Sequence, residues 1–258
     1  MLTLKIQDKS GLTRFVEHGE SEVSLVATSA YVSGDYLVLE VDRPTYLWLQ
    51  WDEGLGRSLV YATENVYFDV PFDEKKICYP PNSFMGDRHL LYAKVASDFE
   101  ISAYRNLALN VNDSHRDCKC YPHATANVET RGESVFAARN AIDGVTANSS
   151  HGEWPYSSWG INQDPKAELK LDFGRDVTVD KIVIYERADF PHDNWWKEVT
   201  INFSDGSTIV APMVKTAEGQ AICFEEKTIT SLTLCNLIKS DDPSPFPALS
   251  QIEVYGRG

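Results

Sequence analysis

Apolar and polar residues alternate with a period of two along most of the chain. Successive side chains of a β-strand point to opposite faces, so this alternation predicts strands that are buried on one side. In the first half the alternating triplets are Leu2, Leu4 and Ile6; Val23, Leu25 and Ala27; Leu37, Leu39 and Val41; Leu47, Leu49 and Trp51; Val66, Phe68 and Val70; and Leu91, Ala93 and Val95. Residues 1–112 are therefore predicted to form a β-sandwich.

The alternation stops in the polar residues 113–122 and then resumes. We predict a linker there and a second all-β domain over residues 123–258. Its alternating sets are Leu169, Leu171 and Phe173; Ile182 and Ile184; Val199, Ile201 and Phe203; Leu232 and Leu234; and Ile252 and Val254. Asp205-Gly206 predicts a two-residue hairpin turn. Only residues 134–142 have a helical pattern.

Four motifs follow one another in this second half. They are Ala-Arg-Asn-Ala-Ile-Asp-Gly at residues 138–144, Leu-Lys-Leu-Asp-Phe-Gly at 169–174, Lys-Ile-Val-Ile-Tyr-Glu-Arg at 181–187, and Pro-Ala-Leu-Ser-Gln-Ile-Glu-Val-Tyr-Gly at 247–256. In this order they resemble the discoidin family, also called F5/8 type C domains or carbohydrate-binding module family 32. The resemblance covers residues 121–258 and has no counterpart in the first half.

The resemblance implies a jelly-roll sandwich, a galactose-binding-like fold with its binding loops at one end. The expected fold class is thus all-β, with two β-sandwiches of which the C-terminal one is a discoidin-like jelly roll. Members of the family bind galactosides, other glycans, phospholipid head groups or proteins. The fold alone therefore does not select the ligand.

Two segments between predicted strands, residues 151–159 and 187–196, hold four of the six tryptophans. A sugar offers an apolar C–H face and a rim of hydroxyls, so its site needs flat rings beside groups that donate and accept hydrogen bonds. These segments predict a glycan site. Its candidate residues are His151, Trp154, Tyr156, Arg187, Asp189, His192, Asn194, Trp195 and Trp196.

A structural role competes with this interpretation. Trp159 and Phe190 are equally typical of core residues below the loops. Arg187 and Asp189 can pair only with each other and so fix a loop. If Trp195 and Trp196 lie in extended chain, one ring points inward and the other outward.

The resemblance also implies a structural calcium ion. In relatives, the Asp of the Ala-x-Asp-Gly turn, a hydroxyl five residues later and a Glu near the last strand contribute ligands. The matching positions here are Asp143, Asn148 and Gln251. Calcium prefers charged oxygen ligands, so the neutral Gln251 predicts a weak site.

The five cysteines are odd in number and predict no disulfide framework. Cys118 and Cys120 lie between His115 and His123, where two thiols and two imidazoles can bind a soft metal. Their Cys-x-Cys spacing is not that of a zinc knuckle, so a polar linker with free thiols is the other interpretation. The first residues lack the apolar core of a secretory signal, which predicts a cytoplasmic protein. An extracellular protein is expected instead if a signal has been removed.

The formal net charge of −14 disfavours nucleic acid and anionic membranes as partners. Non-catalytic glycan binding is the favoured function. The alternatives are a glycan hydrolase or lyase at the domain interface, with Glu153, Asp189, His192 and Asp193 as acid–base candidates, and a protein–protein interaction scaffold. The sequence contains no nucleophile elbow, His-Glu-x-x-His motif or phosphate loop that would favour an enzyme.

Overall fold

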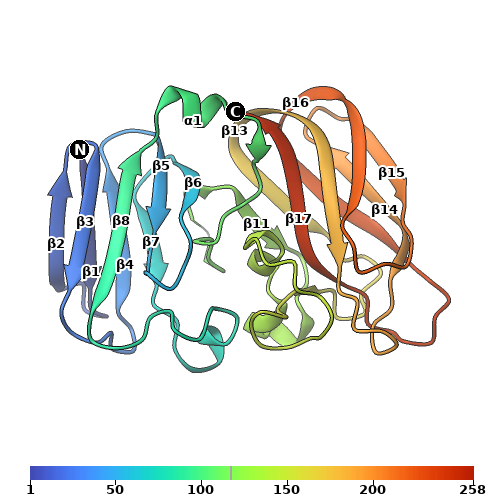
Figure 1. Ribbon diagram of the computed structural model, residues 1–258, viewed down its shortest axis with the longest axis horizontal. Helices are drawn as coiled ribbons and strands as arrows, with labels where there is room; N and C mark the ends of the chain where they lie inside the picture. Colours follow the sequence, from blue (N-terminus) through green and yellow to red (C-terminus); the bar gives the residue numbers. More distant parts are fainter. Residues whose placement is uncertain (117) are drawn as a thin grey trace.

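The computed structural model describes residues 1–116 and 118–258. Two β-sandwiches lie side by side, and helices are few and short (Figure 1). The all-β class predicted from the alternation is confirmed. In the described part of the chain, no helix is both long and apolar enough to cross a membrane.

The first sandwich consists of two antiparallel sheets. One has four strands in the order β2 (Thr13–Gly19), β1 (Leu2–Gln7), β4 (Tyr36–Val41) and β7 (Val66–Asp69). The other has five strands in the order β10 (Cys120–Tyr121), β6 (Ser58–Ala62), β5 (Thr45–Gln50), β8 (His89–Val95) and β3 (Glu22–Ala27). One hydrophobic core fills the space between them.

The second sandwich is one eight-stranded sheet that folds over itself. Its main path is β12 (Trp159–Gly160), β17 (Ala248–Arg257), β13 (Leu169–Glu186), β16 (Gln220–Lys239), β14 (Trp196–Phe203) and β15 (Thr208–Pro212); β9 (Arg105–Asn106) pairs with β17, and β11 (His123–Ala126) pairs with β13. The long strand β13 changes partner along its length, from β11 to β17. It therefore joins the two faces around a second core.

The alternating residues lie where the sequence predicts them. Nearly all are buried in the two cores, and only Val41 and Val95 are half-buried. The predicted hairpin joins β14 to β15, but its loop is longer than two residues. The Phe203 N–H donates to the Ser207 carbonyl, and Gly206 has a φ of +86°. This left-handed conformation suits glycine and is typical of three-residue loops.

The predicted helical segment consists of two 3₁₀ turns, η3 (Ser134–Phe136) and η4 (Ala138–Ile142). Three further short elements have no apolar period long enough to reveal them: η1 (Asp73–Lys76), α1 (Asp98–Ser102) and η2 (Thr130–Gly132). A capping box formed by Ser97 and Glu100 begins α1. Such a box fixes the start of a helix by pairing side-chain oxygens with backbone N–H groups.

The chain crosses between the sandwiches more than once. Strand β9 pairs with β17 in the sheet of the second sandwich, and the following strand β10 returns to pair with β6 of the first. Strand β11 then pairs with β13, and the chain after it stays in the second sheet. Residues 113–122, predicted as a linker, include Asp117, which lies outside the described residues. Asp113, Cys118 and Cys120 within this segment are buried. The division into residues 1–112 and 123–258 stays a prediction.

Arg139 of η4 holds the crossing segment in place. Its guanidinium donates from Nε to the Asp113 carbonyl at 2.9 Å and from Nη2 to the Val111 carbonyl at 3.3 Å. It also lies over the ring of Tyr79, 4.4 Å from the centroid. Arg139 and Asp113 are buried and Val111 is half-buried, so the Asp113 carbonyl in particular is removed from water and depends on the Arg139 N–H groups.

Glu186, the last residue of β13, closes the gap between β13 and β14. Its Oε1 accepts the Trp196 N–H at 2.6 Å, and its Oε2 accepts from the Gln220 amide at 3.2 Å. The side chain is only 1% exposed. Burial raises the pKa of Glu186 to about 8, because desolvation opposes its charge more than the two hydrogen bonds favour it.

We predict that Arg139→Ala lowers the free energy of unfolding by about 3 kcal/mol or more. The reason is that the buried Asp113 carbonyl and the half-buried Val111 carbonyl lose their donors, at a cost of roughly 1–3 kcal/mol for each group left unsatisfied. Arg43→Ala, at an exposed position of the first sandwich, is the control and should change it by less than about 0.5 kcal/mol. Urea denaturation followed by tryptophan fluorescence measures both. Equal midpoints for the two variants would show that Arg139 does not hold the junction.

We also predict that Glu186→Gln removes a pH dependence of stability. The raised pKa means that the folded state keeps a proton that the unfolded state loses near pH 4.5, so wild-type stability falls between about pH 4.5 and 8. At 1.36 kcal/mol per pKa unit the fall over this window amounts to roughly 5 kcal/mol. Denaturation at pH 5 and pH 8 should show a much smaller fall in Glu186→Gln. The exposed control, Glu225→Gln, should retain the wild-type fall; parallel profiles for Glu186→Gln and wild type would contradict the assignment.

Candidate functional site

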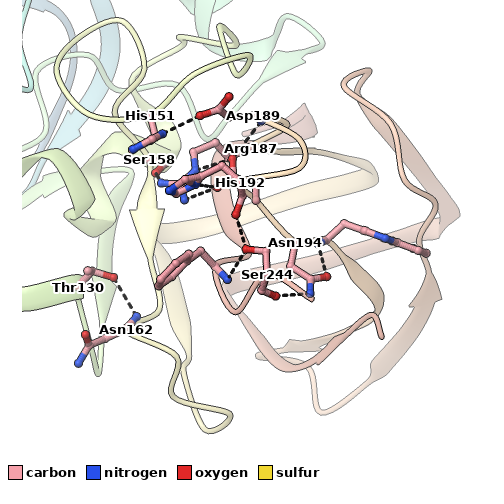
Figure 2. A network of polar contacts seen from close by, with 12 residues as sticks. Thr130, His151, Ser158, Asn162, Arg187, Asp189, His192, Asn194 and Ser244 are labelled. Carbon is pink, nitrogen blue, oxygen red and sulfur yellow. Dashed lines mark hydrogen bonds and ion pairs between the residues drawn. The ribbon is translucent and has the colours of Figure 1, made fainter. Parts of the chain in front are cut away.

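A pocket of about 270 Å³ opens at one end of the second sandwich, where β12 ends, β13 ends and β17 begins. Its walls are formed by residues 160–163 and 245–248, together with Thr130, Arg131, Phe136, His151, Arg187 and His192. Figure 2 shows His151, Arg187 and His192 close together on one side, with the Thr130–Asn162 hydrogen bond on another. Both predicted loops therefore reach this pocket, although each does so with only some of its candidate residues.

Arg187 follows β13 and forms a two-pronged ion pair with Asp193. Nε donates to Oδ2 at 2.9 Å, and Nη2 donates to Oδ1 at 2.5 Å. Its third nitrogen, Nη1, lies 3.4 Å from the Ser158 hydroxyl. The side chains of Arg187 and Asp193 are almost completely buried. The expected pairing of Arg187 with Asp189 alone is thus wrong, because the loop turns back and presents Asp193 to the guanidinium.

Asp189 instead orients His151. Its Oδ2 lies 2.7 Å from the His151 Nδ1. Two further hydrogen bonds close the loop around the ion pair: the Asp189 N–H donates to an Asp193 carboxylate oxygen, and the Asp193 N–H donates to the Asp189 carbonyl. The buried charges therefore fix the loop, and the loop in turn fixes the exposed histidine.

Three flat rings form a stack beside the pocket. The ring centroids of His151 and His192 are 4.1 Å apart with an interplanar angle of 18°, and those of His192 and Phe246 are 5.5 Å apart at 21°. All three side chains are exposed. A stack of this kind presents apolar ring surface to the solvent, while the imidazole nitrogens provide hydrogen-bonding groups at its edge.

Another wall of the pocket is polar and has a strained backbone. Asn162 and Gln163 have φ values of +48° and +59°, in the left-handed region that non-glycine residues rarely adopt. The Asn162 N–H donates to the Thr130 hydroxyl at 2.9 Å. A Cβ at Gly160 would lie 2.5 Å from that hydroxyl, so glycine is required for this close approach. Strained backbone of this kind is concentrated at functional sites.

The structure places the other predicted residues away from the pocket walls. Asn194 is buried, and its amide donates to the carbonyls of Asp242 and Ser244. Trp196 belongs to the second core, and Trp195 is half-buried beside it, so the two rings have different exposures as predicted for extended chain. Trp159, predicted as either core or site, is fully buried.

Trp154 and Tyr156 are half-buried in the loop of residues 151–159. The Trp154 N–H donates to the Ile77 carbonyl of the first sandwich, which attaches this part of the loop to the other half of the molecule. Phe190 is half-buried, with the Lys215 ammonium 4.7 Å from its ring centroid. None of these three residues lines the pocket.

The three residues of the expected calcium site already have hydrogen-bonding roles. An Asp143 oxygen accepts the Val145 N–H, the Gln251 amide oxygen accepts the Gly144 N–H, and the Asn148 amide donates to two carbonyls. Burial raises the pKa of Asp143 to about 6. Asp143 is the one carboxylate among the three, and Ca²⁺ favours several. A weak calcium site stays a prediction.

Phe246, Asn162 and Gln163 are pocket residues that the sequence analysis missed. Phe246 lies in Ser-Pro-Phe-Pro at residues 244–247, where an aromatic ring between two prolines is 42% exposed. That context was a usable signal, since a ring held in a loop cannot easily turn inward. Asn162 and Gln163 lie in the polar turn that ends at Asp164-Pro165, which indicates a turn but not its strained conformation.

Comparisons with known proteins give matches of two kinds. A family model described as a domain of unknown function (DUF7402) matches residues 120–255. No curated protein matches the chain.

Several solved structures are similar to part of the chain. Chitosan-binding module 1 of a chitosanase/glucanase from Paenibacillus sp. IK-5 is 21% identical, with a TM-score of 0.40 over 60% of this chain and 100% of the module. The family 32 module of C. perfringens NanJ, in complex with galactose, is 16% identical, with a TM-score of 0.39 over 51% of this chain and 91% of that one. A fucose-binding module from Streptococcus pneumoniae is 17% identical, with a TM-score of 0.41 over 59% and 98%.

These modules are of the kind that the sequence motifs resemble. The family model covers more than half of the 258 residues. The chain therefore belongs to the family of the domain of unknown function DUF7402.

Proposed function

We propose that the pocket of the second sandwich binds a glycan without cutting it. The observation that carries the proposal is the exposed stack of His151, His192 and Phe246 beside the buried ion pair of Arg187. A sugar needs a flat apolar surface for its C–H face and fixed polar groups for its hydroxyls. The stack provides the surface, and the pocket walls provide the polar groups.

The polar groups are fixed before any ligand binds. Asp193 holds the Arg187 guanidinium in one orientation, and Asp189 holds the His151 ring. Groups held in this way lose little freedom on binding, which improves affinity. A volume of about 270 Å³ is near the lower end of ligand pockets, about 300 Å³, and suits one sugar unit at the end of a chain.

Two further observations support this proposal over the alternatives. Residues 121–258 resemble carbohydrate-binding module family 32, and the charge of −14 disfavours nucleic acid or anionic membrane partners. For the hydrolase or lyase alternative, Asp193 is a weak acid–base candidate because both of its oxygens accept hydrogen bonds from Arg187. A protein scaffold would use the same exposed rings, so it is tested by the binding experiment.

We predict that Phe246→Ala weakens glycan binding by about tenfold, since an aromatic contact contributes roughly 0.5–1.5 kcal/mol beyond its buried area. A glycan array with the intact chain identifies the sugar, and calorimetry then measures its affinity, expected between micromolar and millimolar. Phe99→Ala is the matched control, since Phe99 is 75% exposed in α1 and lies in the first sandwich. The proposal would be contradicted if the chain bound no glycan on the array, or if Phe246→Ala and Phe99→Ala lost the same amount of glycan affinity.

We predict that Arg187→Ala abolishes glycan binding and also destabilises the domain by about 3–5 kcal/mol, because it leaves the buried Asp193 carboxylate without its cation. The double variant Arg187→Met/Asp193→Leu removes both charges. It should recover part of the stability but none of the binding. Denaturation and calorimetry on the same samples separate the two effects. Wild-type stability of Arg187→Ala would show that the pair is not a structural lock.

A further inference from the structure

A second polar site lies in the first sandwich, at the end where β5 finishes and β8 and the turn after β3 begin. Asp52 follows β5 by two residues, and His89 is the first residue of β8. Gln50 pairs with Tyr92 across β5 and β8, and Ala27 pairs with His89 across β3 and β8. These registers bring Asp52 and His89 to the same edge, at the lower end of β8 in Figure 1.

Five buried polar atoms at this edge have no hydrogen-bond partner among the described residues. They are the Tyr31 hydroxyl, the Asp52 Oδ2, the Ser83 hydroxyl and both ring nitrogens of His89. All four side chains are more than nine-tenths buried. An unsatisfied buried group costs roughly 1–3 kcal/mol, so five in one place require an explanation.

The four side chains lie in one site. The rings of Tyr31 and His89 are 3.9 Å apart, and the Asp52 carboxylate faces His89. Asp52 Oδ1 accepts the Gly54 N–H at 2.8 Å, and a Cβ added at Gly54 would lie 2.6 Å from the Ser83 hydroxyl. The Asp52 carboxylate therefore lies beside His89, and the Ser83 hydroxyl lies beside Gly54, two residues after Asp52.

The distance between Asp52 and His89 distinguishes a metal site from an ion pair. Oδ2 and Nδ1 are 3.5 Å apart, and neither atom forms a hydrogen bond to the other. Two ligands bound at about 2.1 Å to one tetrahedral Zn²⁺ lie about 3.4 Å apart. The observed separation therefore leaves room for an ion between the two atoms.

Two other clusters of potential ligands do not have this geometry. Asp189 and His151 are 2.7 Å apart, and Asp113 and His123 are also 2.7 Å apart. Each of these separations is that of a direct hydrogen bond. In both clusters the carboxylate is already hydrogen-bonded to one imidazole nitrogen, whereas no hydrogen bond joins Asp52 Oδ2 to His89.

Glu53 is the third potential ligand and lies on the exposed side of the cluster. Its carboxylate lies within 4.8 Å of the ligand atoms of Asp52 and His89, and its Oε2 accepts the Leu90 N–H at 2.9 Å. Unlike the other two residues, Glu53 is exposed. Burial raises the pKa of Asp52, against the Gly54 hydrogen bond and the His89 interaction. A cation beside this carboxylate would compensate for the loss of water.

We propose that Asp52, Glu53 and His89 bind a divalent transition-metal ion such as Zn²⁺ in the first sandwich. Two carboxylates neutralise the charge of the ion, and a neutral imidazole is a common third ligand. Tyr31 and Ser83 carry the other two unsatisfied hydroxyls at this edge. The site is independent of the glycan pocket and assigns a role to the half of the chain that precedes the family match at residues 120–255.

The test is metal binding by the intact chain after removal of metals with EDTA. We expect one Zn²⁺ per chain by calorimetry and elemental analysis. A visible absorption band should appear with Co²⁺, and the melting temperature should rise when Zn²⁺ is added, since a ligand of the native state stabilises it. A chain that binds neither metal, with a melting temperature unchanged by Zn²⁺ and EDTA, would overturn the proposal. Bound water would then be the explanation for the five unsatisfied atoms.

Variants locate the site. His89→Gln and Asp52→Asn should each weaken Zn²⁺ binding by more than about 100-fold. Loss of a residue that only hydrogen-bonds to a metal ligand already lowers metal affinity by about 10–100-fold, and these two residues are themselves the proposed ligands. Glu53→Gln keeps an oxygen for the Leu90 N–H at an exposed position, so it should fold even if the buried variants do not. It should weaken binding about tenfold or more.

His151→Gln is the matched control, because it removes an imidazole from a different cluster of potential ligands, that of His151, Asp189 and His192. It should leave Zn²⁺ affinity unchanged. If His151→Gln abolishes binding, or if Glu53→Gln binds Zn²⁺ as tightly as wild type, the ion lies elsewhere and the proposal is wrong. Glycan binding is measured separately, so failure of one proposal does not depend on the other.

Discussion

The arrangement of the two sandwiches depends on one buried cation, Arg139. The polypeptide between them carries carbonyl groups into a region without water, and backbone groups in such a place require partners. The guanidinium provides donors for the Val111 and Asp113 carbonyls while its face lies over Tyr79 of the first sandwich. A planar group with five fixed donors can meet these demands together, which a lysine ammonium cannot.

Buried charge serves the second sandwich in a similar way. There the pair of Arg187 and Asp193 closes a loop of seven residues and so determines where the exposed rings of His151 and His192 lie. Such a pair contributes little net stability but specifies one geometry at the cost of removing two charges from water. Fixed geometry is valuable for a ligand that binds through few contacts.

The strands could be predicted from the sequence because their signal is local. Leu4 and Leu25 belong to alternating runs in which burial of one face needs no knowledge of the partner strand. The two-residue strands β9 and β10 have no such run. Their pairing with β17 and β6 follows only from the docked sandwiches, so no pattern in residues 105–121 reveals it.

The kinds of side chain in the glycan pocket could be predicted from the sequence, but the particular residues that line it could be predicted less well. Arg187 and the two histidines stand out as polar groups within aromatic loops, and they do line the pocket. The abundance of tryptophan was a poorer guide, since Trp196 fills the core as large rings usually do. Which carboxylate pairs with Arg187 depends on the path of the loop backbone, and the spacing of Asp189 and Asp193 does not determine it.

The repeated crossing of the chain limits how these halves can be inherited or re-used. The family match begins at residue 120, yet β10 at that boundary is hydrogen-bonded to the sheet of the first sandwich, while β9, which completes the edge of β17, lies before it. A module excised at residue 120 would carry a strand from its neighbour and lack one of its own. A graft of this domain onto another protein should therefore begin before β9 if the edge of β17 is to keep its partner.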